Sequence, residues 1–147
     1  MTIQAQRNSA LAEQLAHVAV VPVLTVDDPA TGVALGRALV AGGLTILEVT
    51  LRTPKALAAL TAMTRDVPGA IVGAGTVLTA DQGAAAIAGG AKFLVSPGTT
   101  PALIEAARHW TQPLLPGAAT ASEAMTLAEH GFAMMKFFPA EPAGGVA

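Results

Sequence analysis

The sequence has no cysteine, and only 12% of its 147 residues are charged. Without cysteine the chain cannot form disulfides, thiolate metal sites or a cysteine nucleophile, which fits a reducing compartment. The few lysines and arginines are scattered singly and the formal net charge is −2, so the sequence offers no basic patch for nucleic acid or an anionic membrane. A small polar or anionic ligand remains compatible with this charge pattern.

The sequence also shows neither the residue spacing of a metal site nor an apolar run typical of a membrane segment. His17, His109 and His130 lie far apart without the spacing of a metal site, so each is interpreted as a surface or helix-end residue. The chain does not begin with a basic segment followed by an apolar one, and no apolar run approaches the ~20 residues of a membrane span. We therefore expect a cytoplasmic protein that binds neither metal nor membrane.

Hydrophobic residues make up 52% of the chain, enough for the core of one domain. Residues 1–17 have helical spacing and predict a leading helix that covers one end of the domain. Residues 18–147 then alternate between β-branched or apolar runs and Ala/Leu-rich segments with helix start and stop signals, giving six βα units, the last incomplete. The predicted strands are residues 18–26, 45–51, 70–77, 91–95, 113–118 and 131–140.

Repeated βα units predict a parallel sheet, either closed as a (β/α)₈ TIM barrel or open and doubly wound. The glycine segment 73–76 lacks the third glycine and the early position of a dinucleotide fingerprint, and is interpreted as a tight turn that admits a small ligand. Unusual polar residues lie near several different strand ends, which is where a barrel builds its active site. We therefore predict an α/β fold of the (β/α)₈ type with about six units present.

Lys136 lies in the middle of the apolar run 131–140. An ammonium buried without a partner is costly, and a neutral amine is a nucleophile that can form a Schiff base with a carbonyl substrate. The alternative is a lysine on the outer face of an edge strand.

In the predicted strand 45–51, alternation puts Glu48, Thr50 and Arg52 on one face, which in a barrel could point inward. One interpretation is an internal Glu48–Arg52 ion pair. The other gives the carboxylate a role as proton shuttle and uses the arginine to bind an anionic group. Thr76 and the segment 96–98 could add ligand contacts, or could simply cap helices and form turns.

Four segments together resemble the KDPG/KHG aldolase family: residues 43–52, residues 73–76 (Gly-Ala-Gly-Thr), residues 96–98 (Ser-Pro-Gly) and residues 136–140 (Lys-Phe-Phe-Pro-Ala). The resemblance implies a class I aldolase that cleaves 2-keto-3-deoxy-6-phosphogluconate to pyruvate and glyceraldehyde 3-phosphate. It also implies possible action on 4-hydroxy-2-oxoglutarate, no cofactor or metal, and a homotrimer of TIM barrels.

By this resemblance, Lys136 is the Schiff-base lysine and Glu48 the general acid and base. Arg52 and Thr76 are expected to hold the pyruvyl carboxylate of the 2-keto acid substrate, and Pro97 and Phe138 to line the pocket.

The length departs from the family pattern, because (β/α)₈ domains usually need at least ~200 residues. We expect two βα units, together with their phosphate-binding segments, to be missing, as in a truncated gene product or a fragment. The alternative function is therefore a catalytically inactive remnant that acts at most as an oligomeric binding or structural module. A third possibility is a pyruvate-forming aldolase with a non-phosphorylated substrate.

Overall fold

The computed structural model describes residues 3–145. Within these residues there are six helices and seven short strands, which alternate except that β5 and β6 follow each other directly. The helices are α1 (Ile3–Leu15), α2 (Pro29–Ala41), α3 (Ala56–Asp66), α4 (Ala80–Ala88), α5 (Pro101–His109) and α6 (Ala121–Glu129). The strands are β1 (Val23–Leu24), β2 (Ile46–Thr50), β3 (Ile71–Gly75), β4 (Leu94–Val95), β5 (Leu114–Leu115), β6 (Gly117–Ala118) and β7 (Lys136–Phe137).

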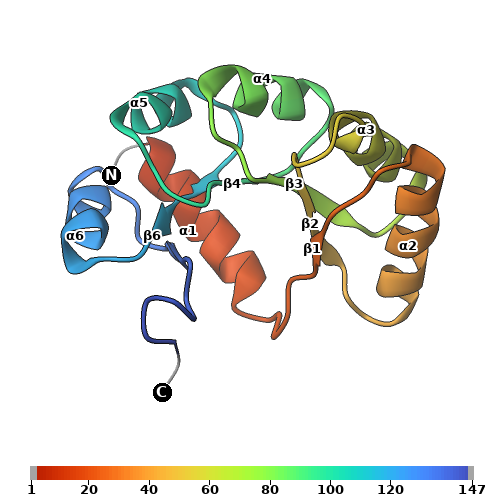
Figure 1. Ribbon diagram of the computed structural model, residues 1–147, viewed down its shortest axis with the longest axis horizontal. Helices are drawn as coiled ribbons and strands as arrows, with labels where there is room; N and C mark the ends of the chain where they lie inside the picture. The colour runs from red at the N-terminus through yellow and green to blue at the C-terminus, as the bar shows by residue number, and fades with distance from the viewer. Residues whose placement is uncertain (1–2, 146–147) are drawn as a thin grey trace.

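All strand pairs are parallel, with the order β1-β2-β3-β4-β5 in one sheet and β6-β7 in a second. Pro116 alone separates β5 from β6, and a proline has no N–H to contribute to a ladder. Since β5 and β6 are one interrupted strand, the two sheets form a single curved series of strands, called the series below. In Figure 1 helices α2 to α6 form an arc outside this series, and α1 lies on its concave side.

Side-chain caps fix the starts of four helices at the carboxyl ends of the strands. In each case an Asp or Thr oxygen accepts a hydrogen bond from a backbone N–H of the first turn, which satisfies a group that the helix itself leaves unpaired. Proline in the first turn of α2 and α5 adds a favourable φ angle. The capping residues are Asp28 (α2), Thr79 (α4), Thr100 (α5) and Thr120 (α6).

Two apolar clusters lie on opposite faces of the strands. The outer cluster packs strand residues such as Leu47 and Val49 against Leu60 and Met63 of α3. The inner cluster joins Leu11 of α1 to Ile46, Phe93 and Val95. These inner residues come mainly from the amino ends of the strands, so α1 covers that end of the domain, as the leading-helix prediction expected.

The two outermost strands are shorter than predicted. The expected strand 18–26 pairs with β2 only at Val23 and Leu24, and the expected strand 131–140 pairs with β6 only at Lys136 and Phe137. Both strands end the series, so within the described residues each has a neighbour on one side only. Val23 is 49% exposed although its β2 neighbour Glu48 is buried, which reflects this open edge.

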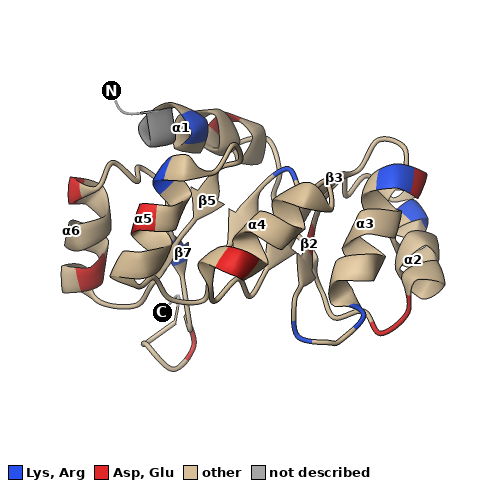
Figure 2. Cartoon of the chain, turned by 90° about the horizontal axis from the view of Figure 1, so that it is seen from above, with Lys and Arg blue, Asp and Glu red and all other residues tan. Residues whose placement is uncertain are grey.

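Within residues 3–145, no helix is both long and apolar enough to cross a membrane. Lys and Arg residues are spread over separate helices and loops rather than gathered on one element (Figure 2). The same described residues contain no group of three or more histidine, aspartate or glutamate side chains placed to hold a metal ion.

Candidate active site

Glu48 lies on the inner face of β2. Its strand neighbours Leu47 and Val49 belong to the outer cluster, whereas Ile46, two residues away, belongs to the inner one. Alternation therefore directs the Glu48 side chain into the concave side, where it is only 5% exposed. The sequence prediction that one face of this strand points inward is confirmed.

The neighbouring strand β3 makes room for this carboxylate by carrying glycine. A Cβ atom built on Gly75 would lie 2.2 Å from Oε1 of Glu48, and one on Gly73 would lie 2.3 Å from the ring of Phe93. The segment ends the predicted strand 70–77, as expected, and both glycines lie within β3. The interpretation that their turn admits a small ligand is wrong, because the space beside them is filled by side chains of this chain. The turn begins only at Thr76.

Lys136 of β7 reaches the same carboxylate from the far side of the series. Its Nζ donates to Oε1 of Glu48 at 3.3 Å and lies 3.5 Å from Oε2. The lysine side chain is 24% exposed, and its Nζ lies 5.2 Å from the centre of the Phe138 ring, within range of a cation–π contact. The alternative of a lysine on the outer face is wrong, since Lys136 points inward.

Arg52 and Thr76 meet where β2 and β3 end. Arg52 Nε donates to Thr76 Oγ1 at 3.2 Å, and the arginine is otherwise exposed. The Glu48–Arg52 ion pair, left open by the sequence, does not form among the described residues, where Glu48 pairs with Lys136. Thr76 has a φ of 57°, a left-handed conformation that is uncommon for a non-glycine residue and is often found at functional sites.

Pro97 lies at the carboxyl end of β4, half-buried, and its carbonyl faces Gly117 of β6, where an added Cβ would lie 2.2 Å from the oxygen. Gly117 is the register partner of Lys136. Pro97 is thus one strand away from the lysine. Ser96 belongs to the segment for which the sequence left ligand contacts and a turn as alternatives. It is fully buried, and its hydroxyl accepts from the Gly117 N–H at 3.4 Å.

Comparison with known proteins supplies the family. A family model described as KDPG and KHG aldolase matches residues 11–147, nearly the whole chain. The chain belongs to the KDPG and KHG aldolase family. The family resemblance stated from four sequence segments is confirmed.

Individual relatives support this assignment and its fold. The KHG/KDPG aldolase of Escherichia coli K12 is 50% identical over 127 residues, and the 2-dehydro-3-deoxy-phosphogluconate aldolase of Dickeya dadantii is 48% identical over the same length. Both alignments cover 86% of this chain and 60% of the relative, so the chain spans about 60% of the length of the curated relatives it matches.

Solved structures agree with the sequence relatives. A KDPG aldolase from Legionella pneumophila, with pyruvate captured as a covalent carbinolamine, superposes with a TM-score of 0.83 at 43% identity, covering 86% of this chain and 61% of that one. The Zymomonas mobilis ZM4 enzyme with 3-phosphoglycerate gives 0.82 at 49% identity, covering 86% and 60%. The aldolase-family chain therefore has an α/β fold of the TIM-barrel type, as predicted. Residues 3–145 hold five complete βα units followed by β7, the strand of an incomplete sixth unit.

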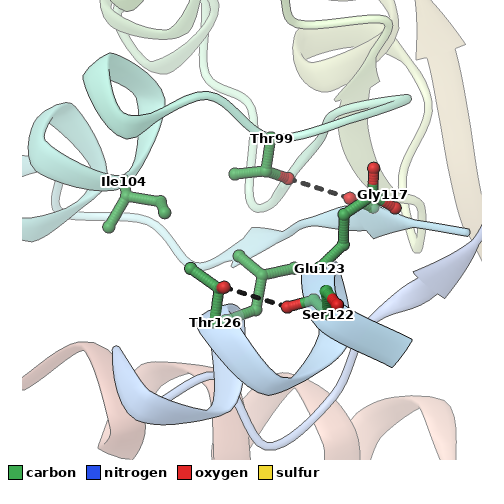
Figure 3. Close-up of a pocket in the computed structure, with 7 residues that line it drawn as sticks. Thr99, Ile104, Gly117, Ser122, Glu123 and Thr126 are labelled. Atoms are coloured by element: carbon green, nitrogen blue, oxygen red, sulfur yellow. Dashed lines mark hydrogen bonds between the residues drawn. The ribbon is translucent and has the colours of Figure 1, made fainter. Parts of the chain in front are cut away.

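A separate pocket of about 200 Å³ lies between α5 and α6, on the outer side of the strands (Figure 3). Its polar groups serve the local structure of this family member. Thr99 Oγ1 donates to the Gly117 carbonyl, and the Glu123 carboxylate accepts from the N–H groups of Ala119 and Thr120. These backbone donors lower the pKa of Glu123 below its ordinary value. The pocket contains neither Lys136 nor Glu48, so the amine and its carboxylate define a different site.

Proposed function

We propose that Lys136 and Glu48 form the reacting pair of a class I aldolase site that takes 2-keto acids. The observation that carries the proposal is the 3.3 Å separation of Lys136 Nζ and Glu48 Oε1 in a largely buried setting. An amine beside one carboxylate is the pairing that Schiff-base chemistry needs, because one group bonds to the carbonyl carbon while the other moves protons. The relative captured with pyruvate as a carbinolamine supports it.

The substrate that we propose is 2-keto-3-deoxy-6-phosphogluconate, with 4-hydroxy-2-oxoglutarate as a second. Lys136 first passes its proton to Glu48, and the neutral amine adds to the C2 carbonyl to give a carbinolamine. Glu48 then gives that proton to the carbinolamine hydroxyl, which leaves as water, so a protonated imine and a Glu48 carboxylate remain. Glu48, directly or through water, takes the proton of the C4 hydroxyl. The C3–C4 bond then breaks, and its electron pair enters the imine as an enamine.

The cycle closes on the same two residues. The C4 fragment leaves as an aldehyde, glyceraldehyde 3-phosphate or glyoxylate. Glu48 returns a proton to C3 of the enamine, and water hydrolyses the imine to release pyruvate and free Lys136. In this proposal Arg52 and Thr76 bind the pyruvyl carboxylate, and Pro97 and Phe138 line the pocket. The hydrogen bond between Arg52 and Thr76 supports a shared role, since it holds a cation beside a hydroxyl at one strand end. No metal or organic cofactor enters this scheme.

The assembly and location that we propose are a homotrimer in the cytoplasm. A designed porous protein cage built from symmetric oligomeric domains is 30% identical to this chain, with a TM-score of 0.76, which supports self-association of this fold. The open outer edges of β1 and β7 are consistent with contacts to another chain.

Borohydride reduction in the presence of pyruvate tests the proposed chemistry. The folded wild-type chain should gain one reduced pyruvyl group, located by peptide mapping at Lys136, and Lys136→Met should gain none. Lys92→Met is the matched control, because Lys92 is exposed at the amino end of β4 and should leave trapping unchanged. A folded wild-type chain without an adduct would contradict the proposal and favour the inactive binding or structural module.

A further inference from the structure

Asn8 of α1 is a fully buried polar side chain that the proposed chemistry does not use. Its amide makes three hydrogen bonds to backbone groups more than one hundred residues away. Nδ2 donates to the Leu114 carbonyl at 3.1 Å, and Oδ1 accepts from the N–H groups of Ala133 at 2.9 Å and Met134 at 2.8 Å. A buried amide satisfied in this way joins β5 to the segment that leads into β7.

The position of this amide follows from the register of β6 and β7. Phe138 N–H donates to the Ala118 carbonyl and Lys136 N–H to the Pro116 carbonyl, two residues apart on each strand. The next bond toward the amino end of the same ladder would join Met134 N–H to the Leu114 carbonyl. Those two groups instead bind the two ends of the Asn8 amide. The side chain is therefore inserted into the ladder in place of one backbone hydrogen bond.

An inserted amide keeps the two strands apart at their amino ends, while Lys136 and Phe138 bring them together two residues later. It thereby sets the direction in which β7 enters the series. The amide is held by its own three hydrogen bonds, and its neighbours on α1 make separate contacts. Arg7 donates to the Trp110 carbonyl after α5, and Leu11, one turn further along α1, is buried in the inner apolar cluster.

We infer that Asn8 is a positioning residue for Lys136, which acts by spacing β7 from β5 so that Nζ reaches the Glu48 carboxylate. The expected effect of Asn8 on catalysis rests on the proposed function. Its expected effect on the position of Lys136 does not. Without the amide, Leu114 and Met134 must either close the ladder directly or lose their partners. Either change moves Lys136, which is two residues from Met134, and a misplacement of about 1 Å can slow a reaction by about 100-fold.

The first measurement reports whether the Lys136 amine and the Glu48 carboxylate are in contact, and it does not require catalytic turnover. A carbodiimide joins a carboxylate to an amine within contact distance as an amide with loss of water, so wild-type chain should yield a Glu48–Lys136 cross-link in peptide mapping. Asn8→Ala should lower that yield about tenfold or more, in keeping with lost alignment. Leu11→Ala is the matched control on the same helix: it loosens the packing of α1 but leaves the amide, and should retain the cross-link.

The second measurement is pyruvate trapping at saturating pyruvate. Asn8→Ala should trap pyruvate about 10- to 100-fold more slowly than wild type. The trapping rate of Leu11→Ala should stay close to that of wild type, even if this variant loses as much thermal stability as Asn8→Ala or more. Asn8→Asp keeps both acceptor contacts but cannot donate to Leu114 when ionised, so it should fall between. It also serves as the variant to measure if Asn8→Ala does not fold.

The outcomes separate the two proposals. Wild-type chain that cross-links but does not trap pyruvate refutes the proposed function, and the cross-link yields of the Asn8 variants still test the inference. Asn8 variants that fold and match wild type in cross-link yield overturn the positioning role, whatever the trapping result. A loss that Leu11→Ala reproduces in full also overturns it, because general loosening of α1 would then be sufficient.

Discussion

Gly75 allows the Glu48 carboxylate to lie where Lys136 can reach it. An added Cβ would lie 2.2 Å from Oε1, 2.7 Å from Cγ and 2.8 Å from Cδ of Glu48, so the whole side chain must move. We expect Gly75→Ala to slow pyruvate trapping by about tenfold or more. Gly42→Ala is the control, since Gly42 ends α2 and nothing lies closer than 3.4 Å to its added Cβ. Equal rates for the two variants would show that Glu48 can relocate without loss.

The residues of the site could be predicted from sequence in unequal degree. Lys136 and Glu48 stand out because each is ionisable in an otherwise apolar strand, and their family resemblance assigns both. The geometry adds that they contact each other, whereas their catalytic roles stay predictions. The sequence contains no indication of a role for Asn8. An asparagine in a helix is ordinary by itself, and the role of Asn8 is visible only from its hydrogen bonds to Leu114 and Met134. Pairing of that kind across the fold leaves no local pattern.

At the scale of elements, α6 begins with a capping box. Thr120 Oγ1 accepts from the Glu123 N–H, while the Glu123 carboxylate accepts from the N–H groups of Thr120 and Ala119. These donors favour the ionised form and hold the pKa of Glu123 below its ordinary value of 4.5. The resulting stabilisation is therefore present above about pH 4.5 and is lost as the pH falls through the lowered pKa.

Glu123→Gln should consequently lower the free energy of unfolding at neutral pH, and the difference from wild type should shrink as the pH falls below about 4.5. Urea titrations at several pH values measure this. Glu129→Gln removes a carboxylate from the carboxyl end of α6. The unpaired N–H groups of a helix lie at its amino end, so this variant should not lower the free energy of unfolding in the same way. A pH-independent difference for Glu123→Gln would refute the charge-based explanation.

The order of helices and strands was predicted correctly because its signals are local, although the predicted central strand 91–95 is reduced to Leu94–Val95 in the structure. Caps such as Thr79 and Thr100 mark helix starts, and the run of Ile46 to Thr50 is long enough to identify β2. The outermost strands were predicted too long, because the apolar runs 18–26 and 131–140 indicate burial but cannot reveal how many residues find a pairing partner. For the latter, the Asn8 amide takes the place of the ladder bond at Met134.

At the scale of the whole molecule, the curved series ends in two outer edges that have no strand partner within residues 3–145. Val20, just before β1, is 57% exposed, and Phe137 of β7 is 47% exposed. Unpaired parallel edges flanked by apolar side chains favour association with another chain. The chain spans about 60% of the length of the curated relatives that it matches.

A charged side chain placed at either outer edge, that of β1 or that of β7, should therefore reduce self-association. We expect Val20→Lys and Phe137→Lys each to shift the average mass in sedimentation velocity toward the 14.6 kDa of one chain, because edge lysines oppose strand pairing. Leu78→Lys is the matched control: Leu78 is 52% exposed, but it follows β3, which has a strand partner on both sides, and its substitution should leave the mass unchanged. If Leu78→Lys lowers the mass as much as the edge variants do, association depends on general surface hydrophobicity rather than on the open edges. A mass that no variant changes would place the contact on another surface of the fold.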